Sequence, residues 1–173
     1  MRHCPFVIGC RWEPSLLWDH PFCPDQAWLE EWLRLTRDET PYVFPQEVSL
    51  LFTDNETIQK YNAQYRGQDK PTNGLSFPSH SPQDIKEFAQ NPIQDGPPIP
   101  IGDLLFAHET LQREALDRGI PFEDHLAHLV VHGMLHLLGY DHEQEDEADH
   151  MEALEVHILG KKGLPNPYES CMV

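Results

Sequence analysis

The sequence has few basic residues. It has 12 lysines and arginines against 29 aspartates and glutamates, which gives a formal net charge of −17. Proteins that coat DNA or RNA electrostatically are basic, so this chain is not of that class, and no DNA partner is expected. The balance is still compatible with a nucleic-acid enzyme that grips its substrate in one local cationic cleft.

Long hydrophobic runs are also missing. The apolar runs span only a few residues, so no segment is expected to cross a bilayer. The segment Met1–Pro14 has no apolar stretch followed by a cleavage site, which is what a secretory signal would show. We therefore expect a cytoplasmic protein with no membrane partner.

Cysteine is scarce as well, and its spacing is uninformative. The sequence has four cysteines: Cys4, Cys10, Cys23 and Cys171. No two of them form a Cys-x-x-Cys pair, which argues against a cysteine zinc site. The chain is not a small secreted scaffold, so we expect ordinary reduced thiols.

The 173 residues are 39% hydrophobic, enough for one packed core. We find no internal repeat and no domain boundary, so a single domain over residues 1–173 is expected. Strand patterns lie at 6–8, 48–53, 75–77 and 101–107, and helix patterns at 25–36, 54–65, 109–118, 122–138 and 143–159. Strands mostly precede helices without strict alternation. This order predicts an α+β fold, in which helices pack on a small mixed sheet.

Three local patterns refine this picture. The stripe of Leu29, Trp32, Leu33 and Leu35 in the first helix is typical of core packing. The run Thr53–Glu56 matches a capping box, which would begin the second helix. Residues 79–100 are rich in proline and show no periodicity, which predicts a long irregular excursion.

Histidine, in contrast to the scarce residue types above, is abundant and clustered. Seven of the eleven histidines lie between His125 and His157, and the run HGMLHLLGYDH contains three of them, His132, His136 and His142. The first two are four residues apart, so both project from one helix face. Gly139 can turn the chain and return His142 toward the same point. Three imidazoles and one open position are the ligand set of a catalytic zinc, so we expect one Zn²⁺ ion on these residues.

The neighbouring polar residues are less decisive. His128 and His136 are separated by about 12 Å of helix rise, too far to share one zinc with bonds of about 2 Å. His125 and His128 are therefore expected to support the ligands or to line the cleft. Asp103 either orients a ligand histidine or ends a strand. Asp141 either assists proton transfer or stabilises the turn.

The histidine spacing also matches the zinc-peptidase pattern H-E-x-x-H-x-x-G-x-x-H, but Gly133 replaces its glutamate. That glutamate is the general base, so its absence argues against peptide hydrolysis. Three neutral imidazoles leave the charge of the ion uncompensated, which suits an anionic phosphodiester. Arg66 and Lys70, in a loop flanked by glycine and proline, are the candidates for gripping phosphate. A surface ion pair is the other interpretation of Arg66.

Several separated motifs carry a family resemblance. They are YRGQDKPTNGLSFP at Tyr65–Pro78, IGDLLF at Ile101–Phe106, HGMLHLLGYDH at His132–His142 and EADHMEALE at Glu147–Glu155. With these motifs in this order, the chain resembles the YbeY family of bacterial endoribonucleases and rRNA maturation factors. The resemblance runs from about Val48 to Tyr168, and an extension of roughly the first 45 residues matches only weakly.

The resemblance implies a zinc-dependent, single-strand-specific endoribonuclease. The family acts in maturation of the 3′ end of small-subunit (16S) rRNA and in ribosome quality control. The implied partners are single-stranded RNA and rRNA, the small ribosomal subunit and its assembly proteins. The family's metal ligands fall on His132, His136 and His142, and its catalytic arginine falls on Arg66. Gly74 stands where the family commonly has a β-branched residue, and we expect it to loosen either the strand entry or the loop that positions Arg66.

Two alternatives stay open on the sequence alone. One is a metallopeptidase-like zinc hydrolase, against which Gly133 counts. The other is a non-catalytic ribosome assembly factor with a structural zinc, against which the open coordination position counts, since structural zinc usually takes four protein ligands.

Overall fold

The computed structural model describes residues 7–92, 96–141 and 144–169. Its centre is a four-stranded sheet in the order β1-β2-β4-β3. The strands are β1 Ile8–Pro14, β2 Gln46–Thr53, β3 Gly74–Pro78 and β4 Ile99–Ala107. β1, β2 and β4 are parallel, whereas β3 pairs antiparallel with β4 at the edge. The predicted mixed sheet is therefore confirmed.

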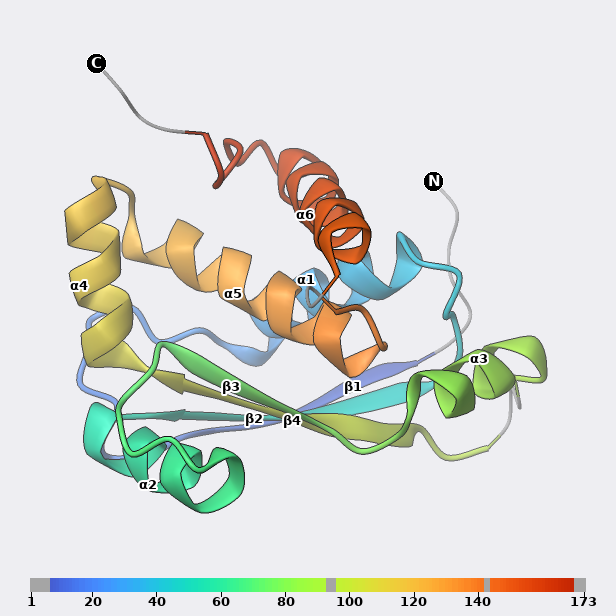
Figure 1. The fold of residues 1–173 in the computed structure, drawn as a ribbon, viewed down its shortest axis with the longest axis horizontal. Coiled ribbons are helices and arrows are strands. Elements are labelled where there is room, and N and C mark those ends of the chain that lie inside the picture. The colour runs from blue at the N-terminus through green and yellow to red at the C-terminus, as the bar shows by residue number, and fades with distance from the viewer. Residues whose placement is uncertain (1–6, 93–95, 142–143, 170–173) are drawn as a thin grey trace.

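Six helices surround this sheet in the described part of the chain. They are α1 Gln26–Asp38, α2 Asn55–Arg66, α3 Pro82–Gln90, α4 His108–Arg118, α5 Phe122–Leu137 and α6 Glu145–Gly160. α1, α5 and α6 lie on one face of the sheet and α2 on the other, while α4 and α3 stand near opposite ends (Figure 1). The α+β class is confirmed. Among the described helices, none combines the length and the apolar character needed to cross a membrane.

The larger core lies between the sheet and α1, α5 and α6. Leu29 and Leu33 of α1 are fully buried in it, and Trp32 is nearly so, which confirms the predicted packing stripe. A smaller core on the opposite face places Ile58 of α2 against Leu75 of β3. The sheet thus fixes α5 and α2 on opposite faces.

Gly133 lets α5 lie close against β4. A Cβ atom added at this position would stand 2.8 Å from the Cδ2 atom of Leu104. Side-chain atoms do not approach so closely without a shift, so the residue at 133 faces the sheet. The residue type that distinguishes this chain from the zinc-peptidase pattern therefore has a packing reason.

The irregular excursion predicted for 79–100 is wrong in its first half, which contains α3. The Ser81 hydroxyl accepts a hydrogen bond from the Asp84 amide at 3.1 Å, and Pro82 occupies the first turn. Both are ordinary features of a helix start. Ile85 is fully buried beneath the helix, and Phe88 and Ala89 pack partly buried against the core, but three apolar residues within nine are too short a pattern to reveal the helix.

Two other boundaries differ from the prediction. Asp54, not Thr53, begins α2, since its carboxylate accepts a hydrogen bond from the Thr57 amide at 2.9 Å. β1 starts at Ile8 and continues to Pro14, past the predicted strand at 6–8. Ile8, Cys10 and Trp12 alternate toward the core, a period of two that Gly9 and the charged Arg11 between them obscured.

Candidate functional site

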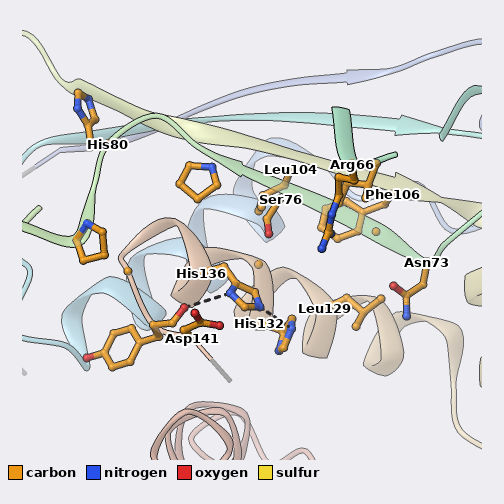
Figure 2. A pocket seen from close by; sticks show the side chains of 17 residues that line it. Arg66, Asn73, Ser76, His80, Leu104, Phe106, Leu129, His132, His136 and Asp141 are labelled. Atoms are coloured by element: carbon orange, nitrogen blue, oxygen red, sulfur yellow. Dashed lines mark hydrogen bonds between the residues drawn. The ribbon is translucent and has the colours of Figure 1, made fainter. Parts of the chain in front are cut away.

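A cavity of about 440 Å³ brings the predicted site residues of three elements together. α5 contributes Leu129, His132, Gly133 and His136 to one wall, and the turn after it adds Asp141. Arg66 and the β3 residues lie across from this helix (Figure 2). The remaining lining residues include Asn73, Ser76, His80, Pro82, Leu104 and Phe106. Residues far apart in sequence thus meet where the motifs predicted a shared site.

His132 and His136 face one another in this cavity. Their Nε2 atoms are 3.0 Å apart. The Nδ1 atom of His136 lies 3.1 Å from the carbonyl oxygen of Tyr140, and the Nδ1 atom of His132 lies against the carboxylate of Glu155. Each ring is therefore held at its outer nitrogen, and its Nε2 atom points into the cavity (Figure 2).

These contacts settle which nitrogen carries the proton in the neutral rings. A carbonyl oxygen and a carboxylate only accept hydrogen bonds, so both Nδ1 atoms donate. Both Nε2 atoms of His132 and His136 then carry lone pairs. Two lone pairs 3.0 Å apart repel one another unless a proton or a metal ion lies between them. The donor set therefore fits a zinc ion, whose bonds to imidazole are about 2.0–2.1 Å.

The third predicted ligand, His142, lies outside the described residues. In the described ranges, no three His, Cys, Asp or Glu side chains converge into a complete metal site. The predicted turn before His142 is present. Gly139 has a φ of +99°, which favours glycine, and its amide donates to the carbonyl oxygen of His136 at 3.0 Å.

Glu155 is a site residue that the sequence reasoning missed. It is fully buried on α6, and its carboxylate contacts His132, His128 and Tyr168. Burial alone would raise the pKa of this carboxyl, but hydrogen bonds from the histidines outweigh it and lower the pKa to about 2. One signal was available, since Glu155 interrupts the apolar stripe formed by Met151 and Ile158 at helical spacing.

Arg66 is the last residue of α2, and its side chain is exposed at the cavity rim. Within the described part of the chain, no hydrogen bond or ion pair engages its guanidinium group. The surface ion pair considered for Arg66 is therefore not formed there. Lys70, the other predicted phosphate-gripping residue, does not line the cavity.

Asn73, which also lines the cavity, is held by a second group of hydrogen bonds that involves Glu114 and His125. The amide nitrogen of Asn73 donates to Glu114 at 3.0 Å, and Glu114 also contacts the Nε2 atom of buried His125 at 2.9 Å. The hydrogen bond from His125 lowers the pKa of Glu114. Asn73 is 41 residues from Glu114 in sequence, so no local pattern announced this contact.

The other predictions for polar residues have mixed outcomes. His125 and His128 do not line the cavity, but each contacts a carboxylate that holds a cavity residue. Asp103 does not end a strand, since it lies in the middle of β4. It lines a separate cavity of about 720 Å³ together with Arg11 and Tyr61, and not the cavity that His132 and His136 line.

Gly74 and Asp141 complete the predicted set. Gly74 is the first residue of β3 and pairs with Phe106 of β4, and the expected loosening of the strand entry or of the Arg66 loop stays a prediction. A Cβ atom added at Gly74 would lie 3.1 Å from the Leu105 carbonyl oxygen, so a larger residue requires a small shift of its neighbours. Asp141 lines the cavity beside His136, and both of its interpretations stay open.

Several known proteins resemble this chain in sequence or in fold. The family model described as endoribonuclease YbeY matches residues 24–163. An endoribonuclease YbeY of Magnetococcus marinus is 55% identical over 125 residues, which cover 72% of this chain and 84% of the relative. One from Rhodospirillum rubrum is 54% identical over 125 residues, which cover 72% of this chain and 59% of that relative. A Thermotoga maritima protein known from a solution structure shares the fold, with 21% identity, a TM-score of 0.51 and coverage of 94% of this chain and 99% of its own.

Proposed function

This chain belongs to the YbeY family of endoribonucleases, and on that premise we propose that it cleaves single-stranded RNA in the cavity between α5 and Arg66. One observation carries the proposal. The imidazoles of His132 and His136 and the guanidinium of Arg66 line the same cavity from opposite sides. A phosphodiester placed there contacts metal-binding and phosphate-binding groups at once.

His132 and His136 would hold one zinc ion through their Nε2 atoms, and the sequence pattern assigns the third ligand to His142. Bound zinc supplies Lewis acidity and brings the pKa of bound water to about 7. The peptidase glutamate is then not required as a strong base. The imidazoles are neutral ligands, so they leave the positive charge of the ion available to an anionic substrate.

Arg66 would grip the phosphate. Its guanidinium can donate two parallel hydrogen bonds to the non-bridging oxygens. Among the described residues that line the cavity, Arg66 is the only arginine or lysine. The loss of this one side chain should therefore remove most of the phosphate binding that the protein itself contributes.

The cellular substrate follows from the family. We infer that the chain acts in the cytoplasm on the 3′ end of 16S rRNA and in ribosome quality control, at the small subunit and with its assembly proteins. A net charge of −17 repels RNA over most of the surface. Docking partners on the ribosome would offset this repulsion and direct the cavity to its site.

The test uses an end-labelled single-stranded RNA and the same RNA annealed to its complement. The zinc-loaded protein is expected to cut the single strand only, and Arg66→Ala is expected to retain zinc but lose cleavage. Lys60→Ala is the matched control, because Lys60 is an exposed cation on the same helix whose nearest acid is Glu56 at 3.8 Å. Equal cleavage by Arg66→Ala and the parent would contradict the proposed role of Arg66.

A further inference from the structure

Glu155 is an ionised carboxylate placed where apolar side chains usually pack. It has no exposed surface, and its neighbours on the inner face of α6 are Met151 and Ile158. An isolated charge in such a place is strongly unfavourable. It is stable here only because hydrogen-bond donors converge on it.

Those donors fix both oxygens of the Glu155 carboxylate. Oε1 accepts from the Nδ1 atom of His132. Oε2 accepts from the Tyr168 hydroxyl, and the Nε2 atom of His128 lies 3.5 Å from the same oxygen. A carboxylate held at both oxygens cannot rotate to a different acceptor geometry. The position of Oε1 relative to His132 is therefore set by Tyr168 and His128.

The consequence for His132 is electronic as well as geometric. A charged acceptor at Nδ1 keeps the ring proton on that atom and leaves the lone pair on Nε2, which faces the cavity. It also makes the ring a stronger base toward a cation. The two histidines differ in the acceptor at this atom, because the Nδ1 atom of His136 donates to the neutral carbonyl oxygen of Tyr140 at 3.1 Å, whereas that of His132 donates to a carboxylate.

We propose that Glu155, held by Tyr168, is a positioning residue that sets the tautomer and orientation of His132 for metal binding. The proposal rests on the metal site of the proposed function. Tyr168 comes from the segment after α6, yet it contacts the carboxylate that orients a cavity residue on α5. The C-terminal segment thereby takes part in the metal site without contacting the ion.

A purely structural role predicts something different. If Glu155 only joined α6 to α5, its loss would lower the free energy of unfolding of the metal-free protein. The folded variant would then bind zinc as the parent does. If Glu155 orients His132, the folded variant binds zinc more weakly.

The experiment measures zinc affinity of the metal-free, full-length chain by competition with a chromophoric chelator. Glu155→Gln preserves size and removes the charge, and we expect its zinc dissociation constant to rise by about 10- to 100-fold. Tyr168→Phe removes one hydroxyl, and we expect a rise of about two- to tenfold, the equivalent of one hydrogen bond. Glu147→Gln is the matched control, because Glu147 is exposed on the same helix, and it should bind as the parent does.

A second measurement reports the tautomer directly. Nitrogen-15 spectra of the histidine rings at pH 8 should place the His132 proton on Nδ1 in the metal-free parent. In Glu155→Gln a larger Nε2–H population is expected at this ring. A structural role would leave this signal unchanged.

The outcomes distinguish failure of the proposed metal site from failure of the positioning role of Glu155. A parent protein that binds no zinc would overturn the proposed metal site itself. A parent that binds zinc, beside a folded Glu155→Gln of equal affinity, would overturn only the positioning role. If Glu155→Gln does not fold, Tyr168→Phe decides, and parental affinity together with a parental His132 tautomer in that variant counts against the proposal.

Discussion

The two sides of the cavity are built differently. On the α5 side, His132 and His136 are each held at the outer nitrogen by Glu155 or by the Tyr140 carbonyl. On the other side, Arg66 ends α2 at the surface, and no described residue pairs with its guanidinium. The two histidine rings are held in place before any ligand arrives, whereas Arg66 on the other side is a long, exposed side chain without such support.

This difference matches what each side would bind. Ligands of an ion must stand at nearly fixed distances, and each one that moves reduces affinity. A phosphate on a flexible RNA strand brings its own positional freedom, and an arginine can follow it at a cost in side-chain entropy of up to about 2 kcal/mol. Rigid support is therefore needed at the histidines and not at Arg66.

The largest effect is expected on the rigid side. His136→Ala should weaken zinc affinity by at least about 100-fold and abolish cleavage with it, because a lost ligand costs more than a lost supporting group. Zinc titration and RNA cleavage on the same sample measure both. His157→Ala, at an exposed histidine of α6, serves as control. Full zinc affinity in His136→Ala would mean that this side of the cavity does not hold the metal.

The second-largest effect tests whether the Arg66 side acts independently of the histidine side. Arg66→Ala should lower the cleavage rate by about 10²- to 10³-fold, the usual loss for one donor to a developing negative charge, with zinc affinity unchanged. Arg66→Lys should retain part of the cleavage rate that Arg66→Ala loses, since an ammonium group carries the positive charge without the paired donors of arginine. Single-turnover kinetics measures the rate. A parallel loss of zinc in Arg66→Ala would show that the sides are not independent.

A third change affects how α5, which carries His132 and His136, packs against the sheet. Gly133→Ala should cost about 1–3 kcal/mol of unfolding free energy, because the added Cβ meets Leu104 at 2.8 Å. Urea denaturation measures the loss. Gly160→Ala is the matched control, since no atom lies within 4 Å of a Cβ added there. Unchanged stability in Gly133→Ala would show that α5 can shift on the sheet without cost.

The smallest effect concerns the helix that carries Arg66. Asp54→Ala should cost about 1 kcal/mol, because it removes the cap of α2. Thr53→Val should cost little, since the buried Thr53 hydroxyl has no hydrogen-bond partner among the described residues. Urea denaturation measures the stability loss of each variant. A larger loss in Thr53→Val than in Asp54→Ala would support Thr53 as the cap, as the capping box predicted.

The cap should also depend on pH. Burial alone would raise the pKa of Asp54, but hydrogen bonds from Thr57 outweigh it, and the net pKa is lowered. A lowered pKa means that the contribution is complete above the ordinary carboxyl pKa and is lost as the pH falls through the lowered value. The difference in stability between the parent and Asp54→Ala should therefore shrink in acid.

The sequence could predict which residues line the cavity where the pattern was local. His132 and His136 share a helix face by spacing alone, and the motif with Arg66 completed the set. The supporting contacts could not be predicted in this way, because Glu155 is 23 residues from His132. Such pairs are set by how helices pack on the sheet, which periodicity does not report. α3 was missed for the opposite reason, since its prolines hid a short helix with one buried residue.

The order of the chain separates the two sides of the cavity. α2 with Arg66, Asn73 and the edge strand β3 all lie between β2 and β4 in the chain. α5 and α6, which carry the histidines and Glu155, come entirely after β4. Insertions or deletions between β2 and β4 would therefore alter the side proposed to contact RNA while leaving α5, which carries His132 and His136, unchanged in sequence. The order of the elements would thus allow substrate contacts to vary independently of the proposed metal ligands.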